Sequence, residues 1–272
     1  MTPPVILTIA GSDSSGGAGI QADLKAIAAN GGYGATAITA LTAQNTAEVR
    51  AVYPSSPESV QDQIEAVLDD MPVRAIKIGM LAEAGIVAMV AACLARVPAI
   101  PVVLDPVLVS SSGRALLAAE ALQLFRRELM PKATLMTPNL PELAALLEVP
   151  EPRSPDEILT LGSDLLALGA QALLIKGGHG AGAVLTDFLL TEQAMVRFDA
   201  PRQESCNLHG TGCTLSAAIA TCLARGMALP DAVARSHAYL QRAIAAGAGQ
   251  SYGAGAGPVD HFYSIAIEGA DV

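Results

Sequence analysis

An α/β fold with a mostly parallel central sheet is predicted, because short apolar runs alternate with longer amphipathic segments along nearly the whole chain. The apolar runs contain few polar positions, which is typical of strands that are buried on both faces. Of the 272 residues, 51% are hydrophobic and only 15% are charged, which indicates a globular chain and not a disordered one. We therefore expect one domain, residues 1–272, with helices on both faces of its sheet.

The individual elements follow from this alternation in chain order. Ser56 and Pro57 match a helix N-cap followed by proline at the first helical position. The predicted strands lie at residues 5–10, 33–42, 48–53, 75–78, 102–104, 134–136, 172–175, 183–186 and 195–198. The predicted helices lie at residues 21–29, 57–69, 82–95, 115–129, 140–147, 156–168, 213–225 and 230–246. The last two strands are expected to form a short antiparallel excursion.

Small, polar and charged residues follow several of the predicted strands directly. The carboxyl ends of parallel strands share one edge of a sheet, and ligands bind along that edge. The residues delivered to it are Gly11-Ser12-Asp13, Gly79-Met80, Asp105-Pro106, Thr137-Pro138-Asn139 and Lys176-Gly177-Gly178. The pattern predicts one long cleft there.

Glycines flank the start of a late helix, in the segment Gly210-Thr211-Gly212-Cys213-Thr214. Glycine leaves the first amides of a helix accessible, and these amides with the helix dipole can bind an anion. That anion could be a phosphoryl group in transfer. An ordinary glycine-containing helix start explains the spacing equally well. Cys213 lies in the first turn, where a thiol has a lowered pKa and can act as a base, although a small buried cysteine is the commoner case.

Asp105, Asn139 and Glu142 form a second candidate group at the same edge. Asn139 and Glu142 are three residues apart at a helix start, so both side chains can face one site. Oxygen ligands of this kind suit Mg²⁺ beside nucleotide phosphates. Asn139 could instead cap the helix, with Glu142 favouring its positive end. Lys176, at a strand end beside two glycines, could neutralise phosphate charge.

Composition excludes several classes of function. The formal net charge is −10, whereas a nucleic-acid surface needs a basic face, and aromatic residues reach only 3%, with no Trp for base stacking. The longest apolar run, residues 85–95, is too short to cross a membrane. The four cysteines lack metal-binding spacing, which favours reduced thiols in the cytoplasm. We expect a cytoplasmic protein that binds neither nucleic acid nor membrane.

The glycine-rich loop at residues 11–19 fails two familiar nucleotide motifs. It lacks the Gly-Lys-Ser/Thr ending of a P-loop. Residues 24–47 contain no Asp or Glu to hold the ribose of a nicotinamide cofactor, which disfavours an oxidoreductase.

Taken together, longer motifs identify a family resemblance. The run at residues 6–25 is similar to the opening of the hydroxymethylpyrimidine/phosphomethylpyrimidine kinases of thiamine biosynthesis, which have the ribokinase-like fold. Six later segments also resemble this family. The later segments are Ala43-Gln44-Asn45-Thr46, Lys77-Ile78-Gly79-Met80, Leu104-Asp105-Pro106-Val107, Thr137-Pro138-Asn139-Leu140-Pro141-Glu142, Lys176-Gly177-Gly178-His179 and His209-Gly210-Thr211-Gly212-Cys213-Thr214.

The resemblance implies a three-layer sandwich with a small β flap at about residues 33–53. It implies ATP-dependent phosphorylation of 4-amino-5-hydroxymethyl-2-methylpyrimidine and then of its monophosphate, with Mg²⁺, in a homodimer. The residues implied at the pyrimidine are Gly11, Asp23, Gln44, Met80 and Val107. Those implied at ATP are Asn139, Lys176, His209 and Thr214, with Asp105 and Glu142 holding Mg²⁺ through water. The implied anion hole is Gly210, Thr211, Gly212 and Cys213, with Cys213 as the base.

One departure and two rival functions remain open. Ser111 stands in a loop where many family members have a lysine, which weakens an expected phosphate contact. Pyridoxal kinase is the nearest rival, because related enzymes phosphorylate a hydroxymethyl group on a pyridine ring. A catalytically silent small-molecule sensor on the same fold is the second rival, disfavoured by the intact Gly210–Cys213 and Asn139–Glu142 elements.

Overall fold

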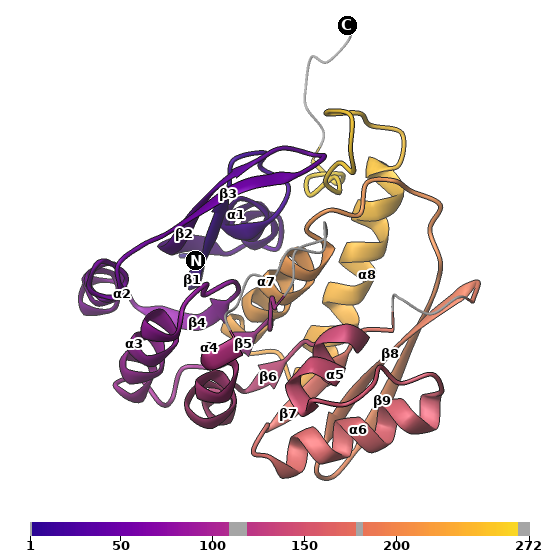
Figure 1. The fold of residues 1–272 in the computed structure, drawn as a ribbon. Helices are drawn as coiled ribbons and strands as arrows, with labels where there is room; N and C mark the ends of the chain where they lie inside the picture. Colours follow the sequence, from indigo (N-terminus) through magenta and orange to yellow (C-terminus); the bar gives the residue numbers. More distant parts are fainter. Residues whose placement is uncertain (1, 109–118, 178–181, 266–272) are drawn as a thin grey trace, which may run out of the picture.

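The computed structural model describes residues 2–108, 119–177 and 182–265. Its strands are β1 (Val5–Asp13), β2 (Tyr33–Gln44), β3 (Val49–Pro54), β4 (Val73–Ile78), β5 (Val102–Leu104), β6 (Leu135–Met136), β7 (Ala172–Ile175), β8 (Val184–Thr191) and β9 (Met195–Pro201). Its α-helices are α1 (Gly19–Ala29), α2 (Pro57–Asp70), α3 (Ala84–Ala95), α4 (Ala119–Leu124), α5 (Leu140–Leu147), α6 (Pro155–Ala167), α7 (Thr211–Ala224) and α8 (Leu229–Gly247). The predicted α/β class is confirmed (Figure 1).

The strands pair into one nine-stranded sheet in the order β3-β2-β1-β4-β5-β6-β7-β8-β9. The six neighbouring strands β2, β1, β4, β5, β6 and β7 are parallel. In contrast, β3 pairs antiparallel with β2, β8 with β7 and β9 with β8. The predicted antiparallel excursion is therefore confirmed as β8 and β9. Because these six strands share one direction, their carboxyl ends meet at one edge of the sheet.

Two hydrophobic cores lie on opposite faces of this sheet. Alternate side chains of β1 enter different cores, since successive residues of a strand point to opposite faces. Ile6 packs with α1, α7 and α8, and Leu7 and Ile9 pack with α2 and α3. All three side chains are completely buried. This double burial explains why the strands read as continuous apolar runs.

Some element boundaries differ from the prediction for identifiable reasons. β1 continues to Asp13 because Ser12 and Asp13 still pair with β2 after a shift in register. β8 continues to Thr191 because its second half pairs with both β7 and β9. Of the helix predicted at 115–129, residues 115–118 lie outside the described ranges. The remainder is α4 followed by a π-helical turn (Phe125–Leu129) and a 3₁₀ turn (Met130–Lys132).

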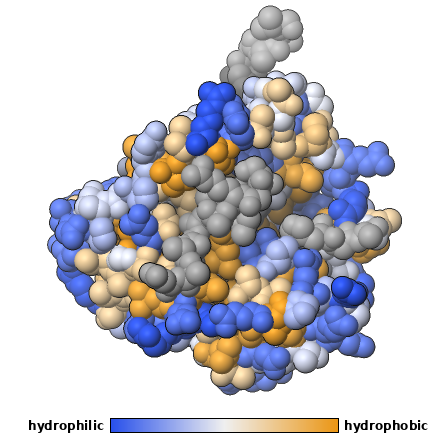
Figure 2. Space-filling model, in the orientation of Figure 1, coloured by the Kyte–Doolittle hydropathy of each residue, from blue (hydrophilic) through white to orange (hydrophobic). Residues whose placement is uncertain are grey.

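None of the helices in the described ranges is long and apolar enough to cross a membrane. On the face seen in Figure 2, hydrophobic and hydrophilic residues lie side by side. A cavity lies at the carboxyl edge of the parallel strands, where the sequence predicts the cleft.

Candidate active site

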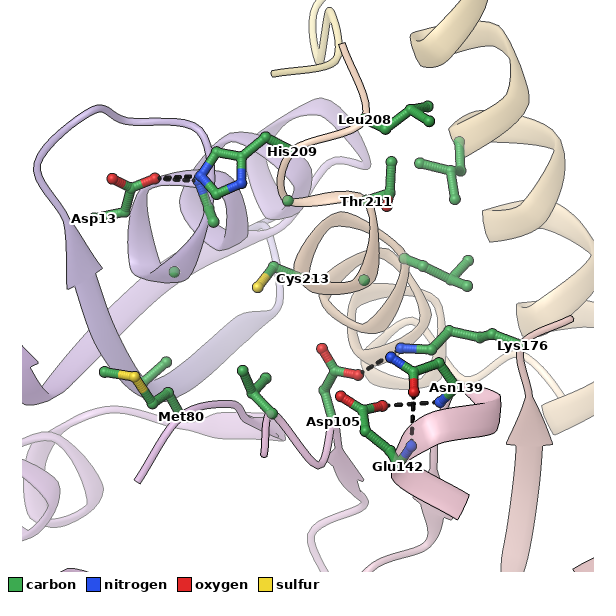
Figure 3. Close-up of a pocket in the computed structure, with 18 of the residues that line it drawn as sticks. Asp13, Met80, Asp105, Asn139, Glu142, Lys176, Leu208, His209, Thr211 and Cys213 are labelled. Carbon is green, nitrogen blue, oxygen red and sulfur yellow. Dashed lines mark hydrogen bonds and ion pairs between the residues drawn. The ribbon is translucent and has the colours of Figure 1, made fainter. Parts of the chain in front are cut away.

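A cavity of about 670 Å³ lies along the carboxyl edge of the sheet. Its walls include Gly11 at the end of β1, Asp105 after β5 and Lys176 after β7. Cys213 and Glu142, which come from the two halves of the sheet, line the same cavity. Figure 3 shows Cys213 between the Met80 side and the group formed by Asp105, Glu142 and Lys176. The predicted cleft is therefore confirmed.

The first turn of α7 presents free amides to this cavity. The amide of Thr211 lies 3.4 Å from the carbonyl of Leu208, whereas the amides of Gly212 and Cys213 donate to no acceptor in the described parts of the chain. Gly210, the N-cap, has φ 77°, a left-handed conformation that favours glycine. A side chain there would overlap the carbonyl of Gly17. The close approach of Gly210 to Gly17 thus brings the N-terminus of α7, a suitable place for an anion, against the β1–α1 loop.

The thiol of Cys213 does not have the low pKa expected at a helix N-terminus. Burial, the largest effect, raises its pKa to about 11, and the carboxylates of Asp23 and Asp105 add to the rise. The Lys77 ammonium and an amide hydrogen bond from Gly19 oppose the rise without cancelling it. The expected lowered pKa is therefore wrong for the ligand-free site, where Cys213 is a protonated thiol.

Lys176 and Asp105 form an ion pair directly below the start of α7. The Lys176 Nζ atom lies 2.9 Å from Asp105 Oδ1, which also accepts a 2.8 Å hydrogen bond from the Thr137 hydroxyl. Burial alone would raise the pKa of Asp105, but Lys176 and Lys77 hold it below its usual value. A Cβ atom at Gly212 would lie 3.3 Å from both Asp105 Oδ2 and Lys176 Nζ. The pair therefore lies directly against Gly212 in the first turn of α7.

Asn139 and Glu142 form a complete capping box at the start of α5. Asn139 Oδ1 accepts from the Glu142 amide at 2.8 Å, and Glu142 Oε2 accepts from the Asn139 amide at 2.8 Å. The capping alternative raised from the sequence is thus confirmed, yet both residues also line the cavity. Burial raises the pKa of Glu142 to about 7 against the opposing charge of Lys176. A buried carboxylate of this kind can accept a further cation.

The other half of the cavity holds most of the residues predicted to contact the pyrimidine. Gly11, Gln44, Met80 and Val107 line it, and a side chain at Gly11 would overlap the Met80 methyl group. His209, predicted to bind ATP, lies on this same side. Its Nε2 atom is 3.0 Å from Asp13 Oδ2 and 3.1 Å from Gln44 Nε2. Its contact with ATP, implied by the resemblance, stays a prediction.

Asp23 lies behind the cavity wall and not on it. Its carboxylate is fully buried, 2.9 Å from Lys77 Nζ and 2.5 Å from the Thr8 hydroxyl. Lys77 is among the residues that line the cavity, although its side chain is fully buried as well. The direct contact between Asp23 and substrate implied by the resemblance stays a prediction; in this structure the carboxylate is the partner that the buried ammonium of Lys77 needs.

Thr214 is also placed differently from its predicted role at ATP. It is completely buried, and its hydroxyl lies 3.0 Å from Nε2 of His261. It is the fourth residue of α7, where the side chain faces the core and not the cavity. The Ser111 position lies outside the described residues, as does His179.

Several wall residues received no individual role from the sequence, although Asp13 was expected at this edge. Asp13 accepts four hydrogen bonds from its own loop, a pattern that Asp followed by Ser and Gly could have indicated. Leu240, Gln241 and Ile244 come from one face of α8. The Gln241 Oε1 atom is buried and accepts no hydrogen bond in the described structure. No local motif marks α8, because its position depends on packing against α7.

Comparisons with known proteins give a consistent result. A family model described as phosphomethylpyrimidine kinase matches residues 13–260. A hydroxymethylpyrimidine/phosphomethylpyrimidine kinase from Salmonella typhimurium is 48% identical over 258 residues, which cover 95% of this chain and 97% of the relative.

Solved structures agree in fold. A phosphomethylpyrimidine kinase from Clostridium difficile 630 superposes with a TM-score of 0.79 at 40% identity, covering 89% of this chain and 99% of the other. A pyridoxal kinase from Staphylococcus aureus in complex with ADP gives a TM-score of 0.89 at 31% identity, covering 98% of this chain and 97% of the other.

Proposed function

Since the chain belongs to the phosphomethylpyrimidine kinase family, we propose how its cavity carries out the reaction of that family. The protein is a phosphotransferase of thiamine biosynthesis that acts on hydroxymethylpyrimidine and on phosphomethylpyrimidine. Structural relatives that hold ADP or AMP-PCP support ATP as the phosphate donor.

The cavity divides into two halves with the start of α7 between them. The half lined by Gly11, Gln44, Met80 and Val107 would hold the pyrimidine alcohol. The other half would hold the nucleotide, against the apolar face of α8 and near Asn139. Gln241 Oε1 there can accept a hydrogen bond from a nucleotide donor. The hydroxyl to be phosphorylated would then face the γ-phosphate beside Cys213.

The free amides of Gly212 and Cys213 would bind the phosphoryl group during transfer. Phosphoryl transfer has a loose transition state, so it depends mainly on alignment and on stabilising charge. Amides fixed by a helix need no reorganisation as the charge shifts. Lys176, held by Asp105 at the same point, would add positive charge beside the transferred group.

Cys213 would orient the substrate hydroxyl and receive its proton only as a thiolate. Lys77 is the charge that favours the thiolate, and Asp23 and Asp105 are the charges that oppose it. A loose transition state makes the hydroxyl proton acidic late in the reaction, so a small thiolate fraction can suffice. The cysteine is thus expected to contribute less than the amides.

Mg²⁺ fits this cavity as an ion shared with the nucleotide. Within the described ranges no three His, Cys, Asp or Glu side chains gather into a metal cluster. Glu142 and Asp105 nevertheless provide two carboxylates at one place, and Mg²⁺ characteristically binds one or two carboxylates together with waters and phosphates. Glu142 would hold the ion through water, and the ion would neutralise phosphate charge. Asp105 would contribute less, because Oδ1 is already bonded to Lys176 and Thr137.

A homodimer is proposed through the free edge of the sheet. Tyr33, Leu41 and Tyr53 expose more than half of their surface on β2 and β3. Exposed aromatic and aliphatic side chains at an edge strand favour association. Light scattering during size exclusion, with Tyr53→Asp as the disrupting variant, tests this arrangement.

The observation that carries the assignment is the shared cavity, which the first turn of α7 lines together with Gln44 and Met80 on one hand and Glu142 on the other. Mass spectrometry of the products with Mg·ATP and hydroxymethylpyrimidine tests it. One added phosphate followed by a second is expected. Absence of both products, with the protein folded, would remove the function.

Pyridoxal kinase is a second candidate, because the pyridoxal kinase from Staphylococcus aureus has the higher TM-score despite its lower identity. A coupled assay of ADP release with each alcohol in turn separates the two. The pyrimidine is expected to be used with the higher kcat/KM.

A further inference from the structure

Gln44, His209 and Asp13 meet at the pyrimidine half of the cavity. His209 Nε2 is 3.0 Å from Asp13 Oδ2 and 3.1 Å from the Gln44 side-chain nitrogen (Figure 3 shows the first contact). A Cβ atom at Gly17 would come within 2.5 Å of His209 Cδ2, so the ring lies directly against this glycine. The imidazole is therefore held in one place by its neighbours.

The Asp13 carboxylate decides which hydrogen bonds this histidine can make. It accepts from the Ser15 amide at 2.8 Å, the Ser15 hydroxyl at 2.7 Å, the Ala18 amide at 2.8 Å and the Gly17 amide at 3.1 Å. Burial alone would raise the pKa of Asp13, but the hydrogen bonds from His209, Ser15 and Ala18 outweigh it and hold the pKa well below its usual range. Asp13 is thus an ionised acceptor, so Nε2 of His209 must carry a hydrogen.

An Nε2–H group cannot also accept a hydrogen bond from the Gln44 NH₂ group. The favoured arrangement turns the Gln44 oxygen toward His209 and its NH₂ group toward the Thr42 hydroxyl, which lies 3.2 Å from the other end of the amide. The Thr42 hydroxyl donates to the Ser12 carbonyl at 2.9 Å, so its lone pairs are free to accept from Gln44. The single Nε2–H hydrogen of His209 is then shared between Asp13 Oδ2 and the Gln44 oxygen, and the Gln44 NH₂ group donates to Thr42.

We propose that Asp13 and His209 are positioning residues that fix the orientation of the Gln44 amide, and that this orientation selects an aminopyrimidine over a pyridoxal ring. The inference rests on the proposed function for the identity of the substrate. It assigns to His209 a role in recognising the acceptor alcohol and not ATP.

The selection follows from the edges that the two rings present beside the reacting hydroxymethyl group. The aminopyrimidine presents an amino donor and then a ring-nitrogen acceptor. Pyridoxal presents an aldehyde acceptor and then a phenolic hydroxyl at the same positions. With the hydroxymethyl group directed at Cys213, the fixed Gln44 amide can direct its oxygen to the amino group of the aminopyrimidine and its NH₂ group to the ring nitrogen. This order of acceptor and donor does not match pyridoxal, whose aldehyde cannot donate a hydrogen bond. The mismatched ring leaves polar groups unpaired, which is costly in a closed site.

The state of His209 can be read directly by NMR of the wild-type protein labelled at its imidazole nitrogens. The proposal expects the Nε2 of His209 to carry the proton at neutral pH, with the aminopyrimidine absent or bound. An unprotonated Nε2 would overturn it. This measurement needs no enzymatic activity, so it remains decisive for the His209 arrangement even if the proposed function fails.

Substitution tests the consequence for selectivity. His209→Phe keeps a ring but removes the N–H, which frees the Gln44 amide to rotate. One lost hydrogen bond of this kind is expected to raise KM for hydroxymethylpyrimidine about tenfold and to lower its preference over pyridoxal by a similar factor, with kcat and the KM for ATP within about twofold.

Ser15→Ala is the matched control. It removes one hydrogen bond to Asp13 and leaves His209 in place, so the preference for the pyrimidine should not change. Unchanged selectivity in His209→Phe, or equal loss in Ser15→Ala, would overturn the proposal. A wild-type protein that phosphorylates neither alcohol would instead count against the proposed function.

Discussion

The reactivity of Cys213 toward an alkylating reagent should be unusually low at neutral pH. A pKa of about 11 lies four units above pH 7, so about one molecule in 10⁴ carries the thiolate that reacts with iodoacetamide. The alkylation rate should rise about tenfold per pH unit and level off only near pH 11. The cause is burial together with two nearby carboxylates, which the Lys77 ammonium offsets only in part.

Peptide mass spectrometry of the ligand-free protein over a pH series measures this rate at each cysteine. Cys206 is exposed and serves as an internal reference for the reagent. Restricted access would scale the Cys213 rate at every pH without moving its midpoint, so the midpoint is the informative quantity. A midpoint at or below pH 8 would refute the reasoning and restore the low pKa suggested by the helix N-terminus alone.

Three substitutions test the remaining parts of the site. Cys213→Ala should lower kcat about 10- to 100-fold with an unchanged melting temperature, since a loose transition state needs little base catalysis; turnover near the wild-type value would remove the cysteine from the mechanism. Gly212→Ala places a Cβ atom 3.3 Å from Lys176 Nζ and Asp105 Oδ2. The new methyl group should displace the amides of this turn and lower kcat about 100-fold. Thr211→Ala adds alanine to the same turn without this overlap and is the control for helix composition. Glu142→Gln should weaken the dependence on Mg²⁺ concentration, and denaturation at pH 5 and pH 8 adds a second readout. The pKa of Glu142 rises from the usual 4.5 to about 7 in the folded protein, so its contribution to the free energy of unfolding declines as pH rises from about 4.5 to 7. Glu142→Gln should lose this decline. An identical dependence of stability on pH in both proteins would contradict the assigned pKa.

The fold was accessible from the sequence because both of its main signals are local. Apolar runs and helix caps such as Ser56-Pro57 lie within a few residues of the elements they define, and the capping Ser56 side chain accepts from the Ser59 amide as its type predicts. The carboxyl-edge rule then placed Asp105, Asn139 and Lys176 together without any knowledge of distances.

What the sequence did not reveal depends on contacts between distant segments. Cys213 is next to a helix start in sequence, but the charges that raise its pKa come from Asp23 and Asp105, far away along the chain. Asp23 matches a binding position by resemblance, yet its carboxylate is fully buried and paired with Lys77 of β4. The partner of His209 is Asp13, near the other end of the chain. Such pairings appear only when the sheet and α7 are assembled.

The most direct test of the catalytic role of α7 is a crystal structure with Mg·ADP, aluminium fluoride and hydroxymethylpyrimidine. Planar aluminium fluoride mimics a phosphoryl group in transfer. It is expected between the pyrimidine hydroxymethyl group and ADP, within hydrogen-bonding distance of the Gly212 and Cys213 amides. A fluoride group bound elsewhere, with those two amides facing only water, would contradict the account.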